Sequence, residues 1–527
     1  MSSDHISTRG INPTRRSLLV GAGAVAVGVS SALPSSSWAR SLTDTIHATL
    51  LSGEPGPSSI ILQARISSAL ATPGDFASDS PGLAGEIRFE FSDNPAFAQA
   101  QSTKWKVAER ERDYIVQQLV EGLTPATTYY FRVAFRSGDG RSSRPSAVGS
   151  FATLPAADTS GPLSFVVMSC LSYELFYGIG KPAPYPIPRA DPPSPEERRR
   201  GYPAMDLIRQ VSPAFLLATG DTVYYDHPSG DSQFWAVNVE QMRQKWHRQL
   251  AVPSVKETFA AVPTFFMKDD HDFRYDDADN TGVRLPTAEE GKQVFLEQVP
   301  VVQGDQPTYR TVRVNRHLQI WLLENRDYRS PNDAPNTPEK TIWGLRQRKW
   351  LEDGLLECDA DFKLIISPGP MVGPDDARKS DNQVSESGFL AEGEAFLNFL
   401  KDHGLEKSTF ILNGDRHWKY HSIHPTGVEE FSCGTINGQN SRPGVAPGDP
   451  RGTDPNARIR QPYLQPIPDG GFLQVSLTPD ADGKKSSLLF QFWGEHGALQ
   501  YAVRRWGDRE PIKVGPWPKE AAARPDK

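Results

Sequence analysis

The sequence has few cysteines, no marked excess of either charge, and too little apolar character for a bundle of membrane spans. Three cysteines in 527 residues cannot build a disulfide scaffold and allow at most one bridge. The 57 basic and 64 acidic residues give a net charge of −7, which offers no support for a nucleic-acid-binding domain. With 38% hydrophobic and 23% charged residues and a mean hydropathy of −0.49, the composition excludes fibrous, collagen-like and multispan membrane proteins.

Residues 1–39 are predicted to form a twin-arginine signal peptide. Arg15 and Arg16 precede an uncharged Gly/Ala/Val stretch, and small residues follow it. The Thr14–Leu19 string resembles a twin-arginine signal, with Leu18 where Phe is more usual. An ordinary secretory signal or a single anchor helix is the alternative. We expect the twin-arginine export machinery to carry the chain to the periplasm or outside the cell, with no stable membrane span after signal removal.

The rest of the chain is predicted to contain two domains. Short strands with period-2 alternation over 40–155 predict a small all-β sandwich, and Gly122–Val133 resembles a turn and strand of fibronectin type III domains. Residues 156–162 have the composition of a linker. Apolar strand runs alternate with helical segments over 163–512, which predicts an α/β domain. Residues 513–527 are predicted to be a C-terminal tail.

Two later apolar runs, 470–479 and 486–494, have the pattern of antiparallel strands and are expected to close a second sheet. This favours a sandwich of sheets flanked by helices over a single doubly wound sheet. The earlier strand candidates are Leu163–Met168, Ala214–Thr219, Pro263–Met267, Leu318–Leu323, Phe362–Ile366 and Thr409–Leu412. Two Pro-rich segments, 181–200 and 437–468, are predicted to be functional covers or disordered insertions.

Polar residues, most of them of metal-binding types, begin where five of the apolar runs end. They are Cys170, Asp221, Tyr224, Asp269, Asp270, His271, Asp272, Asn325, Arg326, Arg329, Asp415 and His417. Sites in open α/β sheets form outside the carboxyl ends of strands, so we expect these tips to converge. Singly, Asp221 could be a turn residue, Cys170 a small buried hydrophobe and His417 a core histidine. The same coincidence at five strand ends favours a functional site.

The Asp-Asp-His-Asp cluster at 269–272 is the hardest of these to explain structurally. Three carboxylates and an imidazole in four residues repel one another unless cations or hydrogen bonds neutralise them. We therefore expect a positive charge beside this cluster.

The ordered set of motifs resembles the PhoD-type alkaline phosphatases of the calcineurin-like metallophosphoesterase superfamily. The matching motifs are Ser169-Cys170, Gly-Asp-x-x-Tyr at 220–224, Asp-Asp-His-Asp at 269–272, Asn-Arg-x-Tyr-Arg at 325–329, Gly-x-x-Gln-x-x-Trp-Leu at 344–351 and Gly-Asp-Arg-His at 414–417. The resemblance implies an α/β fold, a four-layer metallophosphoesterase-type sandwich with two central β-sheets flanked by helices. A small all-β, fibronectin III-like sandwich would precede it.

The resemblance also implies a dinuclear metal site. Its ferric ligands would be Cys170, Asp221, Tyr224 and His417, and Asp221 would bridge to a second site with Asp270 and Asp415. Thiolate and tyrosinate are strong anionic donors suited to Fe³⁺, whereas a carboxylate-rich site suits a hard divalent ion, Ca²⁺ first, with Zn²⁺ or Mn²⁺ as alternatives. Lys268, Glu324 and the Asp226-His227 pair after Tyr225 depart from the usual residues of the family, and we expect them to line the pocket.

The implied activity is that of a phosphoric ester hydrolase acting through a metal-activated water. Asp221 and His271 would be catalytic, with His271 binding the phosphoryl oxygen or protonating the leaving group. Arg326 and Arg329 would hold anionic substrate oxygens, or else form a structural pair between helix and sheet. Substrates would be small-molecule or polymeric phosphate esters.

Three alternatives remain open at this point. The first is cleavage of another ester, such as a phospholipid headgroup diester or a sulfate ester. The second is an exported binding protein without catalysis. The third concerns Cys170 alone, which could form a disulfide with Cys433 in place of binding iron.

Overall fold

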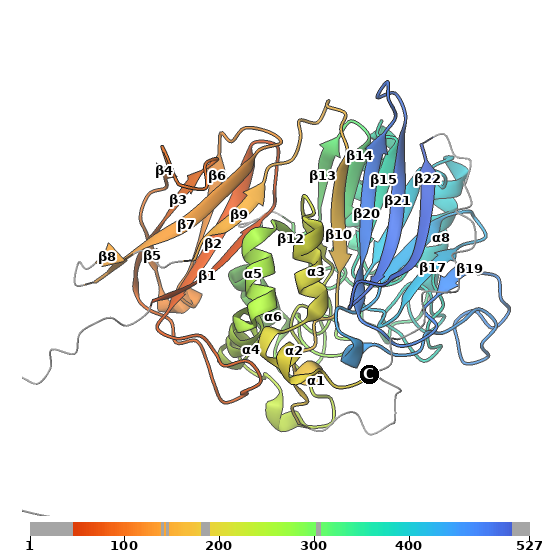
Figure 1. Cartoon of the computed structure of the whole chain (residues 1–527). Coiled ribbons are helices and arrows are strands. Elements are labelled where there is room, and N and C mark those ends of the chain that lie inside the picture. Colours follow the sequence, from red (N-terminus) through yellow and green to blue (C-terminus); the bar gives the residue numbers. More distant parts are fainter. Residues whose placement is uncertain (1–45, 139–141, 144–146, 181–189, 302–306, 508–527) are drawn as a thin grey trace, which may run out of the picture. The chain divides into compact units, whose positions relative to one another are not determined.

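The computed structural model describes residues 46–138, 142–143, 147–180, 190–301 and 307–507 (Figure 1). The predicted signal peptide at 1–39 and the predicted tail at 513–527 lie outside these residues, as does part of the Pro-rich segment 181–200. Among the described residues, no helix is both long and apolar enough to cross a membrane.

Two large sheets form the centre of the α/β region. In spatial order the nine-stranded sheet comprises β22 (Leu499–Trp506), β21 (Ser486–Gly494), β20 (Gly471–Pro479), β10 (Leu163–Met168), β11 (Leu216–Ala218), β12 (Thr264–Phe266), β1 (His47–Gly53), β2 (Ser59–Ser67) and β6 (Ile115–Glu121). The seven-stranded sheet comprises β13 (Arg310–Asn315), β14 (Leu318–Leu322), β15 (Phe362–Ser367), β16 (Thr409–Asn413), β18 (Glu429–Cys433), β17 (Lys419–Ile423) and β19 (Arg460–Leu464). Both sheets mix parallel and antiparallel strands.

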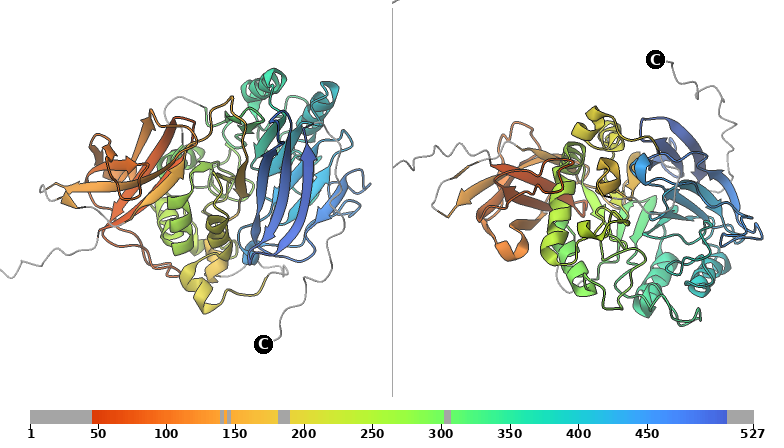
Figure 2. Two further views of the ribbon diagram at one scale, coloured as in Figure 1. Left: turned by 45° about the horizontal axis from the view of Figure 1, so that its top comes forward. Right: turned by 90° about the horizontal axis from the view of Figure 1, so that it is seen from below.

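Helices cover the outer faces of these two sheets (Figure 2). The helices are α1 (Tyr173–Tyr177), α2 (Pro195–Arg200), α3 (Pro203–Val211), α4 (Val239–Ala251), α5 (Pro253–Ala261), α6 (Ala288–Gln298), α7 (Gly344–Glu357) and α8 (Leu390–Asp402). Side chains of α3 to α6 share a core with β10, β11 and β12, and those of α7 and α8 share one with β14, β15 and β16. The layers are therefore helices, sheet, sheet and helices.

Alternate residues of β10 face opposite layers. Phe165 and Val167 lie in the core between the two sheets, whereas Val166 and Met168 lie in the core beneath the helices. Because both faces of the strand are buried from Phe165 to Met168, this part of its sequence reads as a continuous apolar run instead of an alternating one. This is why the strand could be predicted over the same residues from the sequence.

The prediction for the two later runs is wrong in one respect. They form β20 and β21, which are antiparallel as expected, but β20 pairs with β10, with Leu477 opposite Leu163. They extend the first sheet, and the second sheet is built from β13 to β19. An alternating pattern identifies a half-buried strand but carries no information about which strand it pairs with.

The N-terminal strands form two packed layers. The second layer is a sheet of β4 (Gln101–Ser102), β3 (Gly85–Ser92), β7 (Thr128–Ser137) and β8 (Ser142–Ser143), with β5 (Lys106–Ala108) on β3 and β9 (Gly149–Ala152) on β7. It shares a core with β1, β2 and β6. β1 also pairs in parallel with β12, where Gly53 lies opposite Thr264. One layer of the predicted sandwich is thus continuous with the first central sheet.

His247 of α4 connects the helices to this N-terminal part. Its Nδ1 lies 2.6 Å from Asp79 Oδ1 and its Nε2 lies 2.6 Å from Asp113 Oδ2. Arg65 also donates to Asp113 Oδ1, at 2.9 Å. Burial lowers the pKa of His247. Its hydrogen bonds to the two carboxylates raise the pKa by more than burial lowers it, so the net shift is upward. The folded protein therefore favours the imidazolium form.

This arrangement predicts a loss of stability at alkaline pH. Since the pKa of His247 is raised on folding, its contribution is present below the unfolded-state pKa of about 6.5 and is lost as the pH rises through the folded-state pKa. A His247→Gln variant should be less stable than wild type by about 3 kcal/mol near pH 6, and by less near pH 9. Urea unfolding at both pH values measures this. An equal deficit at both values, or an equal effect of His496→Gln at an exposed position, would contradict it.

Candidate metal centre

Strand ends from both central sheets meet at one place. Cys170 follows β10, Asp221 follows β11 and Asp270 follows β12, and these three strands are parallel neighbours. His417 follows β16 of the other sheet. The approach is close, because a Cβ atom added to Gly414 would lie 2.3 Å from the hydroxyl of Thr219 in the loop after β11.

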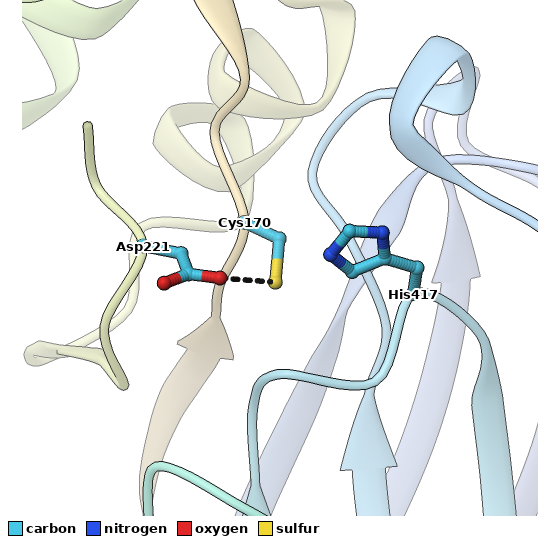
Figure 3. A group of neighbouring side chains, drawn as sticks. All are labelled: Cys170, Asp221 and His417. Carbon is cyan, nitrogen blue, oxygen red and sulfur yellow. Dashed lines mark hydrogen bonds between the residues drawn. The ribbon is translucent and has the colours of Figure 1, made fainter. Parts of the chain in front are cut away.

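Four of the predicted ligands surround one point (Figure 3 shows three of them). Ligand atoms of Cys170, Asp221 and His417 all lie within 4.8 Å of one another. The Cys170 thiol donates to Asp221 Oδ2 at 3.5 Å. The hydroxyl of Tyr224 lies 3.1 Å from the same carboxylate oxygen and 3.5 Å from His417 Nε2. Sulfur, carboxylate, imidazole and phenol therefore converge.

Asp221 belongs to a second group as well. Ligand atoms of Asp221, Asp270 and His271 also lie within 4.8 Å of one another. Asp270 belongs in turn to a third group, with Asp276 and Asp277. One carboxylate thus lies between two sets of ligand atoms, which is the geometry that a bridging ligand requires.

The backbone at three of these positions is in the left-handed region. Cys170, Asp221 and Asp415 have φ of 61°, 56° and 58°. Such values are uncommon for residues other than glycine and cluster at functional sites. Gly220 precedes Asp221 with φ of 108°, and a Cβ there would lie 2.6 Å from the Cβ of Asp269. Only glycine fits this turn, which directs Asp221 into the centre.

The electrostatics of the centre favour a bound cation. Burial raises the pKa of Asp221 well above its usual value, and the neighbouring carboxylates raise it further. Burial and the charge of Asp221 likewise raise the pKa values of Cys170 and Tyr224. Asp221 Oδ1 is buried and has no hydrogen-bond partner among the described residues. A metal ion would satisfy this oxygen and stabilise the anionic forms, so the donor set fits one.

All three cysteines are free thiols in the structure, and Cys170 and Cys433 are not joined. The structure therefore does not support the disulfide alternative, and the Cys170 sulfur is available as a ligand.

Asp415 and the two predicted substrate arginines lie beside these groups. Asp415 forms an ion pair with Arg416, and none of the three-residue ligand groups found among the described residues includes it. Arg326 donates from Nε to Asp269 at 2.6 Å and from Nη2 to Asp381 at 3.2 Å. Its Nη1 donates to a backbone carbonyl at 2.9 Å, so all three guanidinium nitrogens are engaged.

Arg329 is buried near Arg326 and donates from Nη2 to the carbonyl of Asp381. Its Nε and Nη1 have no partner among the described residues, and burial lowers its pKa to about 10. Substrate binding by these arginines stays a prediction, and the hydrogen bonds of Arg326 favour the structural alternative.

Lys268 and Glu324, two of the departures from the family pattern, form an ion pair. Lys268 Nζ lies 2.5 Å from Glu324 and 2.9 Å from Asp327, and its ammonium is almost fully buried. The cation after β12 is thus compensated by acidic residues that follow β14 of the other sheet.

Asp226, another departure from the family pattern, had no predicted catalytic role. Its Oδ1 lies 2.6 Å from Nδ1 of His271, and its other oxygen accepts from the backbone of Asp276. Asp226, Asp270 and Asp221 raise the pKa of His271 well above its usual value although burial opposes this. With Nδ1 bonded to Asp226, His271 has Nε2 left for a partner in the centre.

A second residue without a predicted role is Asn440. It lies in a 3-10 turn (Gly438–Asn440) at the start of the Pro-rich segment 437–468. Its side-chain amide donates to the Tyr224 hydroxyl at 3.0 Å and to the Cys170 carbonyl at 3.2 Å. The strand before this segment, β18 (Glu429–Cys433), is not an apolar run, so the pattern that located the other residues could not locate Asn440.

Comparison with known proteins identifies the family. The sequence profile of PhoD-like phosphatases matches residues 165–480, more than half of the chain, and the profile of their N-terminal domain matches residues 31–155. The chain belongs to the PhoD-like phosphatase family. It is therefore a phosphoric ester hydrolase.

Individual relatives of this PhoD-like protein are distant. Alkaline phosphatase D of Bacillus subtilis (strain 168) is 22% identical over 491 residues, which cover 85% of this chain and 78% of the relative. A solved structure of PhoD superposes with a TM-score of 0.68 at 18% identity, covering 90% of this chain and 92% of that one. Purple acid phosphatase PPD1 from yellow lupin (Lupinus luteus) seeds gives 0.54 at 11% identity, covering 88% and 74%. These structures show a shared fold.

Proposed function

We propose that this PhoD-like protein hydrolyses phosphate esters with a water activated by two metal ions that share Asp221. The observation that carries the proposal is the position of Asp221, whose carboxylate lies within 4.8 Å of ligand atoms of Cys170 and His417 in one group and of Asp270 in the other. Family membership supplies the class of reaction, and this geometry supports the proposed site for it.

The ligand sets suggest different ions for the two positions. Cys170, Tyr224 and His417 join Asp221 at the first position, where anionic sulfur and phenolate oxygen suit Fe³⁺. Carboxylates dominate the second position, where Asp270 and the predicted ligand Asp415 suit Ca²⁺, with Zn²⁺ or Mn²⁺ as alternatives. When bound, such a pair lowers the pKa of a bound water and neutralises charge on the phosphoryl group.

His271 acts as the proton donor to the leaving alcohol in this proposal. Its Nδ1 is held by Asp226 at 2.6 Å, which fixes the ring and leaves the Nε2 proton for transfer. The rings of His227 and His271 pack against the Tyr224 ring, with centroids 4.2 and 4.3 Å from it. This packing restricts rotation of both imidazoles. Direct attack by water predicts inversion at phosphorus and no phosphoenzyme.

The predicted destination is the periplasm or the outside of the cell. This part of the proposal rests on the twin-arginine motif around Arg15 and Arg16. Fusing residues 1–39 to a reporter that is active only outside the cytoplasm tests it, with a variant in which both arginines are lysine as the control.

Three esters test the activity itself: p-nitrophenyl phosphate, bis-p-nitrophenyl phosphate and p-nitrophenyl sulfate. We expect the metal-loaded protein to hydrolyse at least one phosphate ester, and Asp221→Ala to abolish that hydrolysis. Hydrolysis of the sulfate alone would replace the proposed substrate class. No hydrolysis of any ester by fully loaded protein would favour an exported binding protein.

The contact between Asn440 and Tyr224 predicts a spectroscopic change. A tyrosinate bound to ferric iron gives a charge-transfer band, and a hydrogen bond donated to its oxygen stabilises the phenolate orbital and raises the transition energy. Asn440→Leu removes this donor, so the visible band should move to longer wavelength. The neighbouring Gln439→Leu, whose amide donates to the backbone of Asp191, is the control. An unmoved band in Asn440→Leu would contradict the assignment.

A further inference from the structure

One arginine beside the predicted ligands has no anionic partner. Arg442 lies two residues after Asn440, and its backbone N–H donates to the His417 carbonyl at 3.1 Å. Its guanidinium carbon lies 5.5 Å from the centre of the Trp418 ring. Within the described part of the chain, no carboxylate or carbonyl accepts a hydrogen bond from this guanidinium, which is only partly exposed. Its charge is therefore uncompensated.

The other arginine on Trp418 is different. Arg416 lies on the same indole, 5.6 Å from the ring centre, but is fully buried and forms ion pairs with Asp375 and Asp415. Arg442 is also tied to a predicted ligand, because its backbone N–H donates to the His417 carbonyl and its guanidinium lies over the ring of the next residue, Trp418. The residue thus lies beside the centre.

The backbone that carries Arg442 is fixed onto the ligand-bearing strands. Asn440 donates to Tyr224 and to the Cys170 carbonyl, and the Ser441 hydroxyl donates to the His417 carbonyl at 3.0 Å. Gly444 packs so closely on Trp418 that a Cβ there would lie 2.5 Å from the indole ring. This start of the Pro-rich segment is therefore an ordered edge of the metal centre.

We propose that Arg442 binds a non-reacting anionic oxygen of the substrate phosphoryl group and so favours monoesters over diesters. The inference rests on the proposed hydrolysis of phosphate esters at this centre. A guanidinium offers forked donors that match phosphate oxygens, and it is most effective where water is partly excluded. A monoester carries one more anionic oxygen than a diester, so a lone cation beside the metals discriminates between them.

The test compares Arg442→Met and Arg442→Lys in the metal-loaded, full-length protein. Methionine keeps apolar contact with Trp418 and removes the charge. We expect Arg442→Met to lower kcat/KM for p-nitrophenyl phosphate roughly tenfold to a hundredfold, mainly through KM, and to change bis-p-nitrophenyl phosphate much less. Arg442→Lys should lie between, since lysine keeps the charge without the fork. Arg451→Met, an exposed position on the same segment, is the control.

Binding of inorganic phosphate, measured by isothermal titration calorimetry, gives a readout apart from turnover. Its Kd should weaken in Arg442→Met by the same factor as the monoester KM. Unchanged phosphate affinity with an unchanged monoester-to-diester ratio overturns the inference. An equal loss on both esters, accompanied by loss of metal, assigns Arg442 to packing and overturns it too. If wild type hydrolyses no phosphate ester, the proposed function fails, whereas weaker phosphate binding by Arg442→Met still supports the anion site.

Discussion

Replacing Asp221 by alanine is expected to remove both metal ions and to lower kcat/KM for phosphate esters by roughly ten-thousand-fold or more. The physical reason is that Asp221 is the one residue that the group with Cys170 and the group with His271 and Asp270 have in common. Loss of any other ligand leaves one group complete, whereas loss of this carboxylate opens both. Metal analysis and steady-state kinetics on the same preparation measure the two effects together.

The same substitution should leave the metal-free fold intact. Asp221 Oδ1 has no hydrogen-bond partner among the described residues, and burial beside other carboxylates disfavours its charge. Removing it from the metal-free protein therefore relieves repulsion, and the free energy of unfolding should not fall. Asp158→Ala, at an exposed position in the predicted linker, is the control. Full metal content and activity in Asp221→Ala would refute the shared-ligand account.

Replacing His271 by alanine is expected to slow hydrolysis of alkyl phosphates by roughly a hundredfold to ten-thousand-fold. An alkoxide is a poor leaving group that needs a proton, whereas p-nitrophenolate leaves readily without one. The deficit should therefore be much smaller for p-nitrophenyl phosphate. Asp226→Asn should cause a partial version of the same pattern, because Asp226 holds His271 Nδ1.

The informative quantity is the loss of rate on an alkyl phosphate divided by the loss of rate on p-nitrophenyl phosphate. Rates for an alkyl and a p-nitrophenyl monoester, compared between wild type and His271→Ala, give it directly. His496→Ala, at an exposed position, is the control. An equal loss on both substrates would mean that His271 does not protonate the leaving group and acts only by binding the phosphoryl oxygen or the metal.

The strand ends could be predicted from the sequence because burial leaves a strong pattern. β10 ends in the apolar run Phe165–Met168 followed by a polar residue, and the carboxyl ends of parallel neighbours necessarily meet at one edge. This located Cys170, Asp221, Asp270 and His417 without knowledge of their contacts. The pairing of β20 with β10 was not predictable, because an alternating pattern does not name its partner strand.

The residues that support these ligands left no comparable signal. Asp226 and His271 are 45 positions apart and meet only because the loops after β11 and β12 fold toward each other. Asn440 and Arg442 lie in a segment whose composition indicates only a loop. Their roles depend on where this loop packs. Contacts with other parts of the chain, such as the close packing of Gly444 on Trp418, determine that position. Loop position is a property of the folded chain, and local patterning does not encode it.

Elemental analysis of the purified, active protein tests the central claim most directly. The account predicts two metal ions per chain, one of them iron, with both absent from Asp221→Ala. A fully active preparation that contains no stoichiometric metal, or an Asp221→Ala protein that retains both ions, would contradict it.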